Sequence, residues 1–222
     1  MPSYLEECIS AFEATGEEIN GIANSPAKTT LFQINEEDER LDEEKAEIFH
    51  HIVAKLLFVA KRARLDIDQA VSFLCTRVSM STSRDWDKLK RLLTYIRNTI
   101  GMARIIGGGD LQSMMTWVDA SYGTHHDMRG HTGGVISMGK GAVGSKCSKQ
   151  KLNAKSSTET EVIGATDFLP WTVWATRFME MQGHIFKSNV FYQDNQSVMR
   201  LERNGRKSCG DKLVTSIFVS SL

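Results

Sequence analysis

KSSTETEVIGA, residues 155–165, marks the point where the chain changes from glycine-bounded strand sequence to an apolar helical pattern. Ser156 with Glu159, and Thr158 with Glu161, both have the spacing of a capping box. In that motif a hydroxyl and a carboxylate satisfy the free amide groups of a first helical turn. One capping box is enough for one helix. The stretch therefore predicts a helix start and leaves Glu161 free for another role.

The segments around this helix predict a sheet. Residues 111–123, 131–139 and 141–148 are short, bounded by glycine and rich in strand formers, so they are expected to form three consecutive antiparallel strands. Residues 187–194 read as a fourth strand, and a helix is expected from Asn195 to about residue 203. This order of elements predicts an α/β fold, with a mixed sheet and flanking helices.

Within the helix that begins near residue 156, apolar residues recur at helical spacing. Val162, Ala165, Leu169 and Val173 are expected to face the sheet. Glu161 would then lie beside the buried stripe, near the ends of the strands.

The first hundred residues have a different pattern. Apolar residues recur every three or four positions over 44–62, 66–79 and 84–98, which predicts three helices. Gly107, Gly108 and Gly109 form the best candidate boundary. A small all-helical subdomain is therefore expected to precede the sheet.

Composition narrows the classes of function only slightly. The 222 residues contain 27 basic and 27 acidic side chains, so the net charge favours no class of partner. Four cysteines without a Cys-x-x-Cys pair predict reduced thiols in an intracellular protein, cytoplasmic or nuclear. No run of 18 apolar residues occurs, so we expect no membrane partner.

Three carboxylates stand at junctions between predicted elements. Asp119 follows the apolar run MMTWV, Asp194 follows VFYQ, and Glu161 lies within the first turn of the helix. Taken singly, each has a structural explanation, since aspartates are common in bends and turns and Glu161 could cap the helix. Together they come from elements that can converge. Clustered carboxylates repel one another, and Mg²⁺ or Mn²⁺ would relieve that repulsion. Two such ions support hydrolysis of a phosphodiester.

The residues also carry a resemblance to a known family. VDASYGTHHDMRGHTGG (118–134), SKQKLNAKSSTETE (148–161) and FYQDNQSVMRLERNG (191–205) closely resemble the ribonuclease H domain of copia-type retrotransposon polyproteins. Residues 54–99 resemble the segment that joins polymerase to nuclease in the same polyproteins, and residues 3–22 resemble the end of the polymerase palm. The resemblance implies three parts: residues 1–44, a palm remnant and acidic linker; 45–106, a helical thumb- or connection-like subdomain; and 110–222, a ribonuclease H-like domain that is incomplete at its C-terminus.

Site roles follow from the same resemblance. Asp119, Glu161 and Asp194 fall on three of the family's four metal-binding catalytic carboxylates, which hold two Mg²⁺ ions and cleave the RNA strand of an RNA–DNA hybrid. The implied partners are that hybrid and the polymerase portion of a retroelement. Ser157 and Thr158 fall where the family contacts the minor groove, where the 2′-hydroxyl distinguishes RNA from DNA. The remaining residues expected to bind nucleic acid are Lys149, Gln150, Lys151, Asn195 and Gln196.

A basic run without acids could also receive phosphates, although lysines serve equally to protect a solvated hairpin edge. Its members are Lys140, Lys146, Lys149, Lys151 and Lys155.

Departures from the family pattern point to weak or lost activity. No Tyr-x-Asp-Asp signature is present, so DNA synthesis by this chain alone is not expected. The family continues with a fifth strand and a final helix that bears the fourth acid, whereas this chain reads LVTSIFVSSL (213–222) and stops. Asp211 is a poor substitute for that acid. We expect the chain to lack the fifth strand and the helix.

Two alternatives therefore stay open beside a ribonuclease H-like enzyme. One is a catalytically inactive nucleic-acid-binding remnant. The other is an integrase- or transposase-type nuclease of related fold, although those enzymes place their glutamate last in the chain. His125, His126 and His131 cluster in a loop, but no fourth ligand has suitable spacing, so we interpret them as a polar turn.

Overall fold

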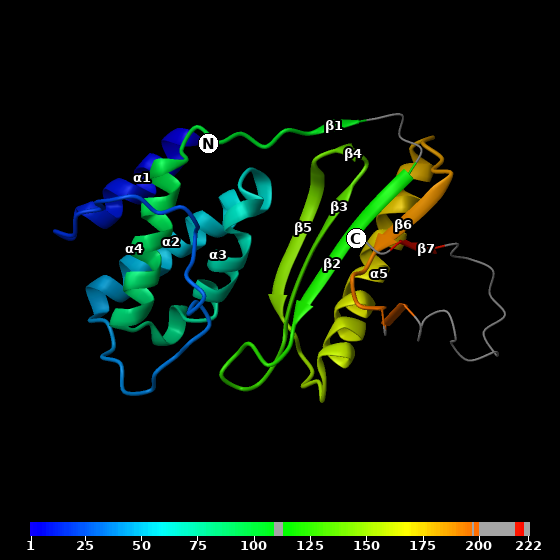
Figure 1. Cartoon of the computed structure of the whole chain (residues 1–222). Coiled ribbons are helices and arrows are strands. Elements are labelled where there is room, and N and C mark those ends of the chain that lie inside the picture. The colour runs from blue at the N-terminus through cyan, green and yellow to red at the C-terminus, as the bar shows by residue number, and fades with distance from the viewer. Residues whose placement is uncertain (109–112, 197, 200–215, 220–222) are drawn as a thin grey trace. The chain divides into compact units, whose positions relative to one another are not determined.

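A computed structural model describes residues 1–108, 113–196, 198–199 and 216–219 (Figure 1). The chain divides into two units, Met1–Arg104 and Ile105–Leu222. The first unit is helical and the second is built on a sheet. The protein is therefore a mixed α/β protein. Among the described residues, none of the helices combines the length and apolar composition that crossing a bilayer requires.

The first unit consists of four α-helices. They are α1 (Pro2–Glu13), α2 (Glu43–Arg62), α3 (Asp68–Cys75) and α4 (Ser83–Asn98). The predicted helices at 44–62 and 84–98 are confirmed. The predicted helix at 66–79 is shorter than expected, because 3₁₀ turns at Leu65–Ile67 and Val78–Met80 flank α3.

Caps and a shared apolar core explain where these helices form. Asp42 caps α2 by accepting a hydrogen bond from the Lys45 amide at 2.8 Å. Thr82 and Asp85 form a complete capping box at the start of α4. In the core, the Phe12 and Trp86 rings stack with centroids 4.6 Å apart. The unit therefore has its own hydrophobic core.

In its described residues, the second unit contains a five-stranded mixed sheet in the order β5-β3-β2-β6-β7. The antiparallel strands are β2 (Ser113–Ser121), β3 (His131–Ser137) and β5 (Ala142–Lys149), which confirms the three predicted antiparallel strands. After α5 (Ser157–Met181), β6 (Ser188–Tyr192) pairs with β2 in parallel. A separate two-residue pairing joins β1 (Gly107–Gly108) to β4 (Gly139–Lys140).

The helix α5 packs along one face of the sheet (Figure 1). Side chains of β2 alternate between buried and exposed, and the buried set faces α5. Phe168 is fully buried and lies so close to Gly134 that a Cβ there would approach its ring to 2.6 Å. The Thr116 and Thr172 hydroxyls share a hydrogen bond of 3.0 Å across the same interface.

The prediction of which α5 residues face the sheet was wrong, because the buried face is rotated about the helix axis from the predicted one. Ala165 is buried as expected, but Leu169 is 38% exposed. The buried face instead follows Glu161, Gly164, Ala165, Phe168, Thr172 and Thr176. The spacing of apolar residues did not predict this face, because Gly164 allows close approach to Ala120 and Thr132, and Thr172 contacts Thr116. Glu161 therefore lies within the buried stripe and not beside it.

The expectation that the chain lacks a fifth strand was also wrong. The strand β7 (Ser216–Val219) pairs in parallel with β6, with Val190 opposite Ile217. The helix predicted from Asn195 falls largely on residues outside the described part of the chain. At its start, the Asn195 side chain accepts a hydrogen bond from the Val198 amide at 3.2 Å, which is the expected N-cap contact.

Candidate metal centre

The parallel pairing of β2 with β6 places Asp119 and Asp194 at the same level along the strand direction. Trp117 of β2 lies opposite Tyr192 of β6. Asp119 and Asp194 each follow their paired aromatic residue by two positions. Since side chains repeat every two residues along an extended chain, both carboxylates belong to the same end of the sheet.

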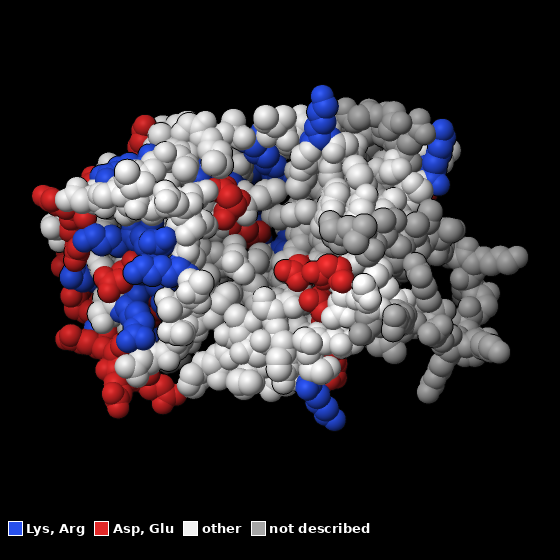
Figure 2. Space-filling view, in the orientation of Figure 1, with Lys and Arg blue, Asp and Glu red and all other residues white. Residues whose placement is uncertain are grey.

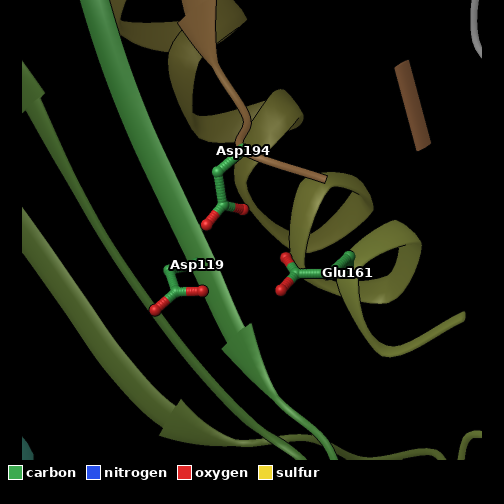
Figure 3. A group of neighbouring side chains, drawn as sticks. All are labelled: Asp119, Glu161 and Asp194. Carbon is green, nitrogen blue, oxygen red and sulfur yellow. The ribbon is translucent and has the colours of Figure 1, made fainter. Parts of the chain in front are cut away.

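The structure brings the third acid to the same place. One oxygen from each of Asp119, Glu161 and Asp194 can be chosen so that all three lie within 4.8 Å of one another. Figure 3 shows the three carboxylates converging from β2, from α5 and from the segment after β6. Both aspartates are exposed, whereas Glu161 is only 7% exposed. A compact group of acidic side chains is also visible on the second unit in Figure 2.

Glu161 is held by groups adjacent to the other two acids. Its Oε1 accepts a hydrogen bond from the amide of Ala120, the residue after Asp119, at 3.3 Å. Its Oε2 accepts one from Nε2 of Gln193, the residue before Asp194, also at 3.3 Å. Burial, and then the Asp119 charge, raise the pKa of Glu161 to about 7. Ionising all three carboxylates at once is therefore unfavourable unless a cation is bound.

At the start of α5, the residues that cap the helix are not the residue that joins the acidic cluster. Ser156 is the N-cap, and its hydroxyl accepts a hydrogen bond from the Glu159 amide at 3.2 Å. The Glu159 carboxylate accepts a hydrogen bond from the Lys155 amide at 2.7 Å. Glu159 thus satisfies the helix end, and the Glu161 carboxylate is free to lie at the sheet.

Gln193 was not identified from the sequence. It is 1% exposed and bridges two parts of the site. Besides donating to Glu161, it accepts a hydrogen bond from the Asn195 amide at 3.1 Å through Oε1. The available signal was its position two residues after the buried Phe191, which places both side chains on the same face of the extended chain.

The donor set fits a hard divalent cation. Carboxylate oxygens are the ligands that Mg²⁺ and Mn²⁺ prefer, and Mg²⁺ retains several waters alongside one or two carboxylates. Two exposed aspartates leave part of the site open to solvent. Among the residues that the structure describes, these three acids are the group of His, Cys, Asp and Glu side chains placed to share an ion.

The residues expected to bind nucleic acid fall in different surroundings. Ser157, Lys151 and Gln196 are exposed, and Thr158 and Asn195 are half-buried. Lys149 pairs with Asp127 at 2.6 Å.

Gln150 differs from these residues, because it is only 1% exposed. Its Nε2 donates to the Thr132 hydroxyl at 2.8 Å and to the Thr160 carbonyl at 2.9 Å. The side chain therefore ties α5 to β3 and does not lie on the surface.

The histidine cluster is more buried than a polar turn would be. His125 and His131 are 4% and 3% exposed, and their rings share a hydrogen bond of 3.0 Å between Nε2 of His125 and Nδ1 of His131. The other ring nitrogen of His131 lies 3.0 Å from Sγ of Cys147. Burial, and then the Lys149 charge, lower the pKa of His125 to about 4. His126 is exposed.

The chain is similar in sequence to proteins of transposons. It is 31% identical over 153 residues to the retrovirus-related Pol polyprotein from transposon TNT 1-94 of Nicotiana tabacum, a match that covers 68% of this chain and 11% of the polyprotein. It is 31% identical over 121 residues to a transposon Ty5-1 protein of Saccharomyces cerevisiae, covering 54% of this chain and 39% of that protein. It is 28% identical over 151 residues to the Pol polyprotein from transposon RE2 of Arabidopsis thaliana, covering 66% of this chain and 10% of the polyprotein.

The chain thus matches about a tenth of the length of the two Pol polyproteins. No family model matches it. No solved structure matches it either.

Proposed function

From the premise that this chain is a retrotransposon-derived polyprotein segment, we propose that its second unit is a ribonuclease H-like nuclease. Its substrate would be the RNA strand of an RNA–DNA hybrid, and its cofactor Mg²⁺ or Mn²⁺. The observation that carries the proposal is the convergence of Asp119, Glu161 and Asp194 within 4.8 Å. The reaction would be hydrolysis of a phosphodiester.

The order of the acids supports this proposal over an integrase- or transposase-type nuclease. Those enzymes place their glutamate after the second aspartate. Here the glutamate comes from α5, between the β2 aspartate and the aspartate that follows β6.

Each side chain then has a distinct task. Asp119 and Asp194 offer exposed carboxylate oxygens to the ions, and Glu161 supplies a ligand held in position by Ala120 and Gln193. Bound Mg²⁺ would lower the pKa of a coordinated water and neutralise charge on the attacking and leaving oxygens. Because the Glu161 carboxylate must be ionised to serve as a ligand, proton loss from it should accompany metal binding.

Discrimination between RNA and DNA would fall to the start of α5. Ser157 is exposed and Thr158 half-buried, three to four residues before Glu161. Hydroxyls in this position can contact the 2′-hydroxyl across a minor groove, which a DNA strand lacks.

Weak turnover is part of the proposal. The described residues supply three acids to the cluster, whereas the resemblance implies four. Asp211, the poor substitute for the fourth acid, lies outside the described residues. One ligand fewer should weaken the hold on a second ion and slow cleavage.

The test is cleavage of a labelled RNA–DNA hybrid by the 222-residue chain in Mg²⁺ and in Mn²⁺. We expect slow cleavage of the RNA strand that is abolished in Asp119→Asn and Glu161→Gln. Asp167→Asn is the matched control, because Asp167 is exposed on the same helix and outside the cluster. A DNA duplex of the same sequence should stay intact.

A second measurement distinguishes the inactive-remnant alternative. Mn²⁺ binding by calorimetry should be saturable for the wild type and lost in Asp119→Asn. Hybrid binding that weakens with salt, without cleavage or metal binding, would show a nucleic-acid-binding remnant and refute the nuclease proposal.

A further inference from the structure

The first unit contains a cavity of its own, distant in sequence from the acidic cluster. Its volume is about 530 Å³, within the range of roughly 300–1,000 Å³ that is typical of small-molecule sites. It lies between the segment over residues 20–33 and the face of α4 that carries Arg84, Lys88, Arg91 and Thr94. The cavity is therefore formed within one unit.

The lining is strongly basic. Five basic side chains and one acidic side chain, Asp87, contribute to it. Figure 2 shows Lys and Arg side chains gathered over α4 on the first unit. The basic members of the lining are Lys28, Arg84, Lys88, Lys90 and Arg91.

Three of these cations are already paired with carboxylates. Arg84 pairs with Asp38 at 3.1 Å, and Lys90 pairs with Glu17 at 2.8 Å. Lys88 lies 3.4 Å from a carboxylate oxygen of Asp85 and also donates to the Gln33 carbonyl at 2.7 Å. Carboxylates of the protein therefore balance these three charges.

Arg91 is different. In the part of the chain that the structure describes, its hydrogen-bond partner is a neutral group, the Ser25 hydroxyl, at 3.1 Å from Nη2. Its Nε is buried and has no partner among the described residues. A buried donor without an acceptor destabilises the fold. Arg91 also lines the cavity, and no carboxylate among the described residues pairs with it, so an anion in the cavity would balance its charge.

The loop geometry holds the Arg91 guanidinium in place. The Ser25 hydroxyl accepts from Arg91 and donates to the Ala27 carbonyl at 2.9 Å. The Ala23 amide donates to the Asn98 side chain at 2.9 Å, which ties the loop to the end of α4. Lys28, exposed in this loop, has no carboxylate partner among the described residues and lies on the rim of the cavity.

We propose that this cavity is a phosphate-binding site in which Arg91 and Lys28 hold the anion. Arginine binds phosphate through several donors in a planar fork, and lysine adds a point charge. The phosphate group could belong to a free or terminal phosphate or to the backbone of a nucleic acid. The site is separate from the acidic cluster and needs no divalent ion.

The experiment uses the whole chain with EDTA present, so that the acidic cluster binds no metal. Calorimetry with inorganic phosphate tests the free anion. A short oligodeoxythymidylate without terminal phosphates tests the backbone diester. Binding of inorganic phosphate alone would identify a free or terminal phosphate as the ligand, and binding of the oligonucleotide would identify the backbone.

Three variants decide whether the cavity is responsible. Arg91→Gln should weaken binding about tenfold or more, because it removes a charge-assisted contact. Lys28→Gln, at an exposed position where folding is not at risk, should weaken it about threefold. Arg97→Gln removes a charge from the same helix outside the cavity and should change affinity less than about twofold. Equal weakening by Arg91→Gln and Arg97→Gln, or no saturable binding of either probe, would overturn the proposal.

Discussion

Replacing Glu161 by glutamine should make the metal-free protein more stable at pH 8. Glu161 is buried beside Asp119, and together these surroundings raise its pKa from 4.5 to about 7. Between these values the folded protein holds a proton that the unfolded chain has lost. Stability must therefore fall as pH rises through this window, and the loss is complete above pH 7.

The magnitude follows from the size of the shift. One pKa unit corresponds to about 1.4 kcal/mol, so ionised Glu161 costs the metal-free fold at most about 3 kcal/mol. Glutamine removes the charge but offers only one acceptor for two donors, the Ala120 amide and Nε2 of Gln193. The lost hydrogen bond costs about 1 kcal/mol. The expected net gain is about 2 kcal/mol at pH 8 and close to zero or negative at pH 5.

The assay is urea unfolding in EDTA, followed by tryptophan fluorescence. Three of the four tryptophans, Trp117, Trp171 and Trp174, belong to the second unit and report on it. Asp167→Asn controls for loss of an exposed charge on the same helix and should change stability by less than about 0.5 kcal/mol. A Glu161→Gln protein that is no more stable than the wild type at pH 8, or whose advantage is the same at pH 5, would refute the reasoning.

The remaining predictions concern the packing and the histidines. Phe168→Ala should destabilise the second unit by about 3–5 kcal/mol, whereas Leu169→Ala should cost less than about 1 kcal/mol; urea midpoints measure both. In the Glu161→Gln background, stability should decline by up to about 3 kcal/mol as pH falls from 6.5 to 4, because the unfolded chain protonates His125 first; a flat profile would contradict this. Thr82→Ala should cost the first unit about 1 kcal/mol by removing the capping box, and a loss of helical circular dichroism at lower urea would report it.

Much of this architecture was predictable because local rules determine it. Helix caps and strand periodicity depend on neighbours in sequence, so the start of α5 and the three antiparallel strands were predicted correctly. The phase of α5 was not, because the contact with the sheet selects small residues. Gly164 approaches Ala120 so closely that a Cβ would lie 3.1 Å from the alanine Cβ. Hydrophobic spacing favours large apolar side chains and misses such a contact.

Residues that act through tertiary contacts were harder to predict. Gln193 and Gln150 are both polar and both 1% exposed, and each bridges α5 to the strands. In sequence, Gln150 stands within a basic run, which predicts a surface position, and Gln193 stands beside Asp194 with no local pattern that predicts its burial. Their burial depends on which face of the sheet α5 covers, which no local pattern specifies.

The convergence of the acids depends on one topological step. Adjacent parallel strands cannot be joined by a tight turn, so a crossover must run back along the sheet. The crossover between β2 and β6 contains β3, β4, β5 and α5, and α5 runs opposite to both parallel strands (Figure 1). Its N-terminal end therefore lies where β2 and β6 finish, which is where Glu161 meets the two aspartates.

A register slip of one residue between β2 and β6 would move Asp119 and Asp194 to different levels along the strands and to opposite orientations, because side chains alternate along a strand. The Trp117–Tyr192 stack, with ring centroids 4.8 Å apart, is formed in the observed register and opposes that slip.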